Sequence, residues 1–247
     1  MPNHQLLNNV THHDIKILTD YAGDYGDNVG AVVTFPTEFG DVQKEYPIFF
    51  RQHPDTKAYQ AVAMLGLLND QNLFIQDGQW RANYIPAAVS RGPFAIGFQD
   101  QSAEGGAEKT PVIHIDLDHP RVNREKGHAV FLQHGGNSPY LEHISHIFTH
   151  MMDGMELGEK MIEAFTSLDL FEAVELELNL YDNEKHRLHG NYTISEAKLQ
   201  ALSADTLHQL HRAGFLQCAY LIRASMSNVQ KLVNWQNQIS QPADEAS

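Results

Sequence analysis

The chain has 247 residues, of which 42% are hydrophobic and 19% are charged. This length and composition are typical of a chain that folds around a hydrophobic core, and they exclude collagen-like, low-complexity and mostly disordered chains. The formal net charge is −14, and no three Lys or Arg residues are adjacent. Because a nucleic-acid binder needs a basic surface, we expect no nucleic-acid partner.

The sequence also lacks the usual signals for membrane insertion and export. No apolar run reaches the roughly 18 residues of a membrane helix, so we expect no integral membrane segment. The start, MPNHQLLNNVTHHD, has neither a cationic nor an apolar signal region, so we expect a cytoplasmic protein. The single cysteine, Cys218, excludes an internal disulfide, and its apolar surroundings predict a buried thiol.

The first half is rich in strand and turn signals. Residues 47–51 and 59–67 predict a hairpin around a turn at 53–56, and Thr34 or Thr37 is expected to cap a short helix ending near Tyr46. Asp77–Gly78 indicates another turn, and the glycine-rich residues 100–110 are expected to form a loop. Further strands are expected at 14–18, 30–35, 73–75, 95–98 and 110–118.

The second half follows helical spacing, interrupted by one hairpin. Ser138 is expected to cap a helix with Pro139 in its first turn, and a second helical stretch covers 159–171. Alternating residues predict a hairpin near 174–194, with its turn at Asp182–Asn183. Ser195 and Ser203 are expected to cap two helices, and a last helix covers 216–238.

These elements predict an α+β fold. A β-rich N-terminal half, residues 1–135, is expected to pack with a C-terminal half, residues 136–247, made of helices and the hairpin near 174–194. The pattern leaves open whether the halves form one compact domain.

Several phrases occur in an order and spacing that resemble the SapC family of bacterial proteins. The resemblance runs from about residue 6 to residue 235. The phrases are LLNNV at 6–10, TFPTEFGDVQKEYPIFF at 34–50, NLF at 72–74, YIP at 84–86, IDLDHPRV at 115–122, SPYLE at 138–142, YTISEAKLQAL at 192–202 and LHRAGFLQ at 210–217.

The resemblance implies a non-catalytic accessory protein rather than a defined reaction. Such a protein would bind a protein or small-molecule partner in a bacterial surface-layer or nutrient-uptake pathway, and a homo-oligomer is compatible with it. The family supplies no catalytic residues to carry over. The cofactor therefore stays unknown, and so does whether the chain is an enzyme.

A metal-dependent enzyme is the alternative prediction from the residues. His114 and Asp116 are two apart in an expected strand, so their side chains point the same way. His186, on the second hairpin strand, would complete the facial triad of a non-haem iron oxygenase. Arg121 or Arg187 would then pair with a cosubstrate carboxylate. The competing interpretation is that His114 and Asp116 face water from a half-buried sheet.

The 15 histidines raise two further hypotheses. His143, His146 and His150 share one helical stripe, which fits either a metal-binding pair or the edge of the apolar face. Protonation of many histidines near pH 5.5 would cancel much of the negative charge. This predicts either poor solubility in mild acid or an acid-responsive assembly.

Overall fold

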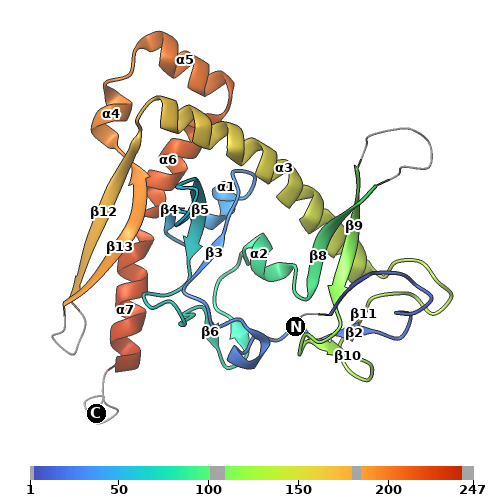
Figure 1. Cartoon of the computed structure of the whole chain (residues 1–247). Helices are drawn as coiled ribbons and strands as arrows, with labels where there is room; N and C mark the ends of the chain where they lie inside the picture. The colour runs from blue at the N-terminus through green and yellow to red at the C-terminus, as the bar shows by residue number, and fades with distance from the viewer. Residues whose placement is uncertain (1–2, 101–108, 180–184, 241–247) are drawn as a thin grey trace. The chain divides into compact units, whose positions relative to one another are not determined.

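The computed structural model describes residues 3–100, 109–179 and 185–240, without the side chains of 100, 109, 176–179, 185–188 and 240 (Figure 1). The chain forms two compact units, each built from two separate segments. One contains Met1–Asp27 and Ala87–Met151, and the other contains Asn28–Pro86 and Met152–Ser247. Helices and antiparallel sheets are both present, which confirms the α+β class. The packing of a β-rich half against a helical half, divided near residue 135, stays a prediction.

The first unit contains two small antiparallel sheets. One has the order β1 (His4–Leu6), β9 (Lys109–Asp116), β8 (Phe94–Asp100), so the strands expected at 95–98 and 110–118 pair as neighbours. In the other, β2 (Lys16–Ile17) lies between β10 (Val122–Asn123) and β11 (His128–Ala129). The unit also contains η1 (Gly23–Tyr25) and α2 (Ala87–Ser90). Its buried core is Ile15, Ile17, Phe94, Ile115, Val130, Phe131, Leu141, Ile144 and Phe148.

The second unit is built around one five-stranded antiparallel sheet. Its order is β12 (Phe171–Asn179), β13 (Lys185–Ile194), β4 (Ile48–Gln52), β5 (Tyr59–Met64), β3 (Ala31–Val33). Both predicted hairpins, β4–β5 and β12–β13, are confirmed. Pairing of β13 with β4 joins them, with Asn191 opposite Arg51 and Tyr192 opposite Phe50.

A smaller hairpin confirms the turn expected at Asp77–Gly78. It joins β6 (Ile75–Gln76) to β7 (Gln79–Trp80). Both turn residues have positive φ, 53° and 75°, as the tightest hairpin turns require. The strand expected at 73–75 begins only at Ile75, because Leu73 and Phe74 are buried in the preceding turn.

The second unit also contains several helices along its described residues. They are α1 (Phe39–Val42), α4 (Glu196–Gln200), α5 (Ala204–Arg212), α6 (Phe215–Ser225) and α7 (Asn228–Ser240). The cap at Ser203 is confirmed, since its Oγ accepts the Thr206 N–H at 3.2 Å. Ser195 occupies the N-cap position of α4 without such a bond. The Thr cap on α1 was wrong, because Glu38 is its N-cap residue.

Two helix predictions in the second half of the chain differ from the structure. The stretches around 141–155 and 159–171 form one continuous helix, α3 (Pro139–Ser167). The predicted cap at Ser138 is confirmed, since its Oγ accepts the Leu141 N–H at 3.2 Å. The single helix expected at 216–238 is divided after Ser225. The Ser225 hydroxyl is buried and accepts the Ile48 N–H at 2.9 Å, so this turn is fixed to β4.

Cys218 lies in α6 and is buried, as predicted. Burial raises the pKa of its thiol to about 11. Among the helices that the structure describes, none is long and apolar enough to cross a membrane.

Candidate functional site

Two glycines bring α3 close to the chain that leaves β3. Gly154 and Gly158 are four residues apart and therefore share one face of the helix. A Cβ at Gly154 would lie 2.6 Å from both Phe35 Cβ and Thr37 Oγ1, which is too close for any larger residue. A Cβ at Gly158 would lie 3.5 Å from Pro36 Cδ, an ordinary contact. Gly154 therefore sets the approach of the helix.

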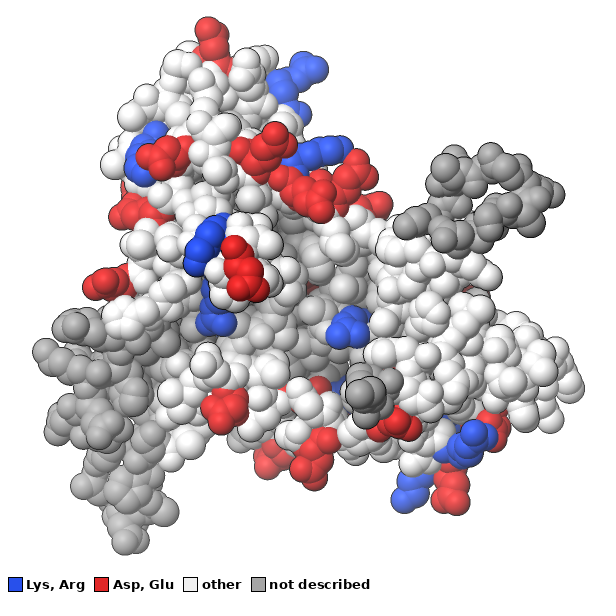
Figure 2. All heavy atoms as spheres, viewed as in Figure 1, with Lys and Arg blue, Asp and Glu red and all other residues white. Residues whose placement is uncertain are grey.

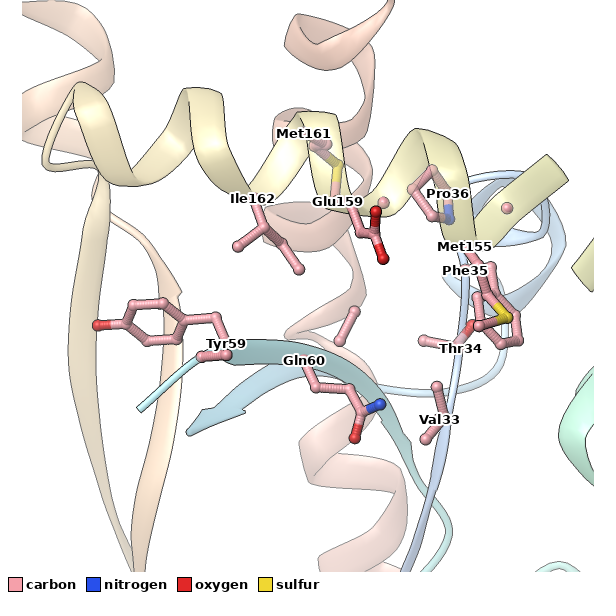
Figure 3. A pocket seen from close by; sticks show the side chains of 14 residues that line it. Val33, Thr34, Phe35, Pro36, Tyr59, Gln60, Met155, Glu159, Met161 and Ile162 are labelled. Carbon is pink, nitrogen blue, oxygen red and sulfur yellow. The ribbon is translucent and has the colours of Figure 1, made fainter. Parts of the chain in front are cut away.

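Beside this contact lies a cleft of about 270 Å³, between α3 on one side and β3 and β5 on the other. Figure 3 shows Ile162 and Glu159 extending from α3 toward the strands, with Tyr59 at one end and Phe35 at the other. Glu159 is the only charged one among the described residues of the lining. These are Val33, Thr34, Phe35, Pro36, Ala58, Tyr59, Gln60, Ala61, Gly154, Met155, Gly158, Glu159, Met161 and Ile162.

A buried hydrogen-bond network fixes the strand end at the cleft. Glu38 is 6% exposed, and its Oε1 accepts the Thr34 hydroxyl at 2.8 Å and the Phe35 N–H at 3.2 Å. The Tyr84 hydroxyl donates to Glu38 Oε2 at 2.7 Å. Burial, and then the neighbouring Glu38 charge, raise the pKa of Tyr84 well above its usual value.

This network positions the cleft rather than reacting in it. Glu38 does not line the cleft, and donors occupy both of its oxygens. The Thr34 hydroxyl, which does line the cleft, already gives its proton to Glu38. The cleft therefore offers a ligand apolar contact, the side-chain amide of Gln60 and one carboxylate, Glu159.

His114 and Asp116 lie two apart on β9, as predicted. The His114 ring packs against Gly97 of β8, where an added Cβ would come within 2.1 Å of it. Asp116 Oδ1 accepts the N–H groups of Asn3 at 2.8 Å and Asp118 at 3.2 Å.

The third predicted ligand, His186, lies in β13 opposite Leu178, and its side chain is outside the described residues. The complete triad therefore stays a prediction. Among the side chains that the structure describes, no three His, Cys, Asp or Glu residues gather as a metal-binding group. His143, His146 and His150 are exposed along α3.

Arg121, expected to bind a cosubstrate, already has a partner. It is 5% exposed, and its Nη2 lies 2.6 Å from Asp27 Oδ2. The rings of Tyr21 and Tyr25 lie 4.9 and 5.4 Å from its guanidinium carbon. This geometry is that of a structural ion pair in the first unit. The side chain of the other candidate, Arg187, is outside the described residues.

Sequence reasoning missed Gly154, Gly158 and Glu159. The available signal was a pair of glycines four apart in an otherwise helical pattern, which calls for a packing reason. The acidic composition is visible on the face drawn in Figure 2, where described acidic side chains outnumber and are interspersed with basic ones.

Residues 7–232 match the model of the SapC family. No curated protein and no solved structure matches the chain. The matched range contains all the residues that line the cleft, including those of the phrase TFPTEFGDVQKEYPIFF.

Proposed function

The chain belongs to the SapC family, and from this premise we propose that it is a non-catalytic accessory protein that binds a small molecule. Its place would be a bacterial surface-layer or nutrient-uptake pathway. The observation that carries the proposal is the apolar cleft between α3, β3 and β5.

The size and walls of the cleft favour a small apolar group. Its volume of about 270 Å³ is just below the range of roughly 300–1,000 Å³ that is usual for small-molecule sites, so the ligand should be small. Met155 and Met161 line it, and unbranched thioether side chains adapt to ligands of different shape. Met155 is 52% exposed, so a ligand would cover apolar surface that now faces water.

The head group of the ligand is inferred from Glu159. This exposed carboxylate extends into the cleft, and the structure shows no ion pair for it among the described residues. The net charge of −14 also favours cations over anions near the surface. The proposed ligand therefore combines a short apolar body with an ammonium group.

Titration of protein labelled with ¹³C at its methionine methyl groups tests the proposal. Hexylamine should shift the Met155 and Met161 signals at lower concentration than hexanol or hexanoate does. Gly158→Leu should abolish the shifts by filling the cleft, whereas Gly158→Ala should keep them. Glu159→Gln should remove the preference for hexylamine over hexanol. If none of the three compounds shifts these signals, small-molecule binding is wrong and a protein partner takes its place.

A metal-dependent oxygenase using His114, Asp116 and His186 is the second candidate. It is supported by the placement of His114 and Asp116 two apart on β9. Elemental mass spectrometry of tag-free protein tests it. Near-stoichiometric iron, lost in folded His114→Ala and Asp116→Ala variants, would support it. Absence of metal after anaerobic iron loading would rule out the oxygenase.

A further inference from the structure

A second cavity, of about 460 Å³, is lined by the C-terminal end of β4, by part of β13 and by the segment that follows β5. Among the described residues it shares no lining residue with the cleft. It includes the cross-strand pair Arg51 and Asn191. Among the described residues, its lining contains no Asp or Glu, although the chain has 31 of them. The lining is Gly30, Arg51, Gln52, Met64, Gly66, Leu67, Leu68, Asn69, His189, Gly190 and Asn191.

The Arg51 guanidinium is held in place through its Nε. Its Nε donates to Asn191 Oδ1 at 3.0 Å, and Asn191 is itself 2% exposed and thus fixed. No described carboxylate lies within 4.0 Å of Arg51, so the two terminal nitrogens have no acidic partner in that part of the chain. Burial alone lowers the pKa of Arg51, as expected for a partly desolvated cation without a counter-charge.

Backbone hydrogen bonds fix the part of the cavity wall that carries Leu67 and Leu68. The Gly30 N–H donates to Asn69 O at 2.7 Å, and the N–H groups of Leu65 and Gly66 donate to Gly30 O at 2.8 and 3.0 Å. A Cβ at Gly30 would lie 2.1 Å from Leu68 O, so only glycine allows this approach. These bonds fix the segment that places Leu68, which is 45% exposed, at the cavity.

We propose that this cavity binds a small organic carboxylate or phosphate that carries an apolar body. The guanidinium of Arg51 presents two parallel N–H groups, the geometry that carboxylate and phosphate oxygens match. Asn191 fixes the direction of that fork, and Leu67 and Leu68 cover the apolar part of the ligand. The site does not depend on the proposed function of the cleft.

Calorimetric titration with hexanoate, hexyl phosphate, inorganic phosphate and hexanol tests the proposal. The wild-type protein should bind hexanoate or hexyl phosphate at least about tenfold more tightly than hexanol, because a charge-assisted hydrogen bond is added. The preferred compound identifies which oxyanion the site takes. Equal binding of hexanol would overturn the proposal, and so would tighter binding of inorganic phosphate alone.

Arg51→Gln should weaken binding of the preferred anion at least about tenfold. Arg91→Gln is the matched control, because Arg91 is also half-buried with a pKa lowered by burial but does not line the cavity. Unchanged affinity in Arg51→Gln would overturn the proposal.

A second pair of variants leaves the sheet intact. Leu68 is exposed, so Leu68→Asp and Leu68→Asn should both fold. The two differ mainly in one negative charge, and Leu68→Asp should bind the anion several-fold more weakly than Leu68→Asn. Equal affinities in these two folded variants would show that the anion binds elsewhere and would overturn the proposal.

Discussion

Single residues decide how closely α3 approaches the second unit's sheet. Gly154 and Gly158 look alike in sequence, since both are helical glycines on the same face. Their surroundings differ, because a Cβ at Gly154 would lie 2.6 Å from the Phe35 Cβ, whose position the backbone fixes, whereas a Cβ at Gly158 would make only an ordinary contact with Pro36. Glycine is thus required by packing at the first position and is only tolerated at the second.

We expect opposite effects of alanine at the two positions. Gly158→Ala should raise the free energy of unfolding by about 0.5–1 kcal/mol, because alanine favours the helix and restricts the unfolded chain. Gly154→Ala should lower it by about 1–3 kcal/mol through overpacking against Phe35. Urea unfolding of both variants checks this. Equal changes would mean that the helix contact relaxes freely.

A second residue-scale prediction concerns alkaline pH. Burial raises the pKa of Tyr84 above its usual range and that of Tyr140 to about 12. The folded protein then holds these protons at a pH where the unfolded chain, with tyrosine pKa values near 10, has lost them. The contribution to stability is complete below about pH 10 and falls as pH rises through the folded pKa values.

Urea unfolding between pH 9 and 11.5 should therefore show a declining free energy of unfolding. Tyr84→Phe and Tyr140→Phe should each make the decline shallower, whereas Tyr220→Phe, at a position 57% exposed, should not. A decline that is the same in all three variants would assign the effect to other groups.

At the scale of elements, the sequence predicted helix caps and turns better than it predicted where long helices break or continue. Ser138, Ser203 and the Asp77–Gly78 turn were predictable because each acts on residues within a few positions. The break after Ser225 was not, because the atom that fixes it, the Ile48 N–H, is 177 residues away. The joining of two stretches into α3 was missed for a related reason. The helix needs a glycine at position 154 because Phe35, more than a hundred residues away, packs against it.

Ser225→Ala should lower the free energy of unfolding by about 1–3 kcal/mol, because it leaves the buried Ile48 N–H without its acceptor. Ser227→Ala, in the exposed turn two residues on, should change it by less than about 0.5 kcal/mol. Chemical denaturation measures both. A small effect of Ser225→Ala would mean that water replaces the hydroxyl.

At the scale of the whole molecule, each unit is assembled from segments far apart in the sequence. The sequence indicated the α+β class, because alternation and helical spacing are local properties. It gave no signal for the pairing of β13 with β4, which brings Asn191 to Arg51. The cleft and the cavity were unpredictable for the same reason. Their walls come from elements such as β5 and α3 that only the tertiary fold brings together.

At this scale, the net charge predicts how the protein behaves in mild acid. Acidification from pH 7 to about 5.5 protonates histidines and reduces the charge of −14, so light scattering should rise. Burial lowers the pKa of His12 and His119, so these two should gain charge only at a lower pH than a histidine of ordinary pKa would. Flat scattering over this range would exclude both acid-driven assembly and loss of solubility there.

The buried thiol of Cys218 can report local unfolding of α6. It is the only cysteine in the chain, and it is enclosed within α6. Ellman's reagent at pH 8 should therefore react about a hundredfold or more slowly with the folded protein than with the urea-unfolded chain, at a rate set by opening of α6. Because the chain has no other thiol, the absorbance change would measure the rate at which α6 opens. Repeating the reaction with ligand present would show whether binding in the cleft or the cavity slows this opening.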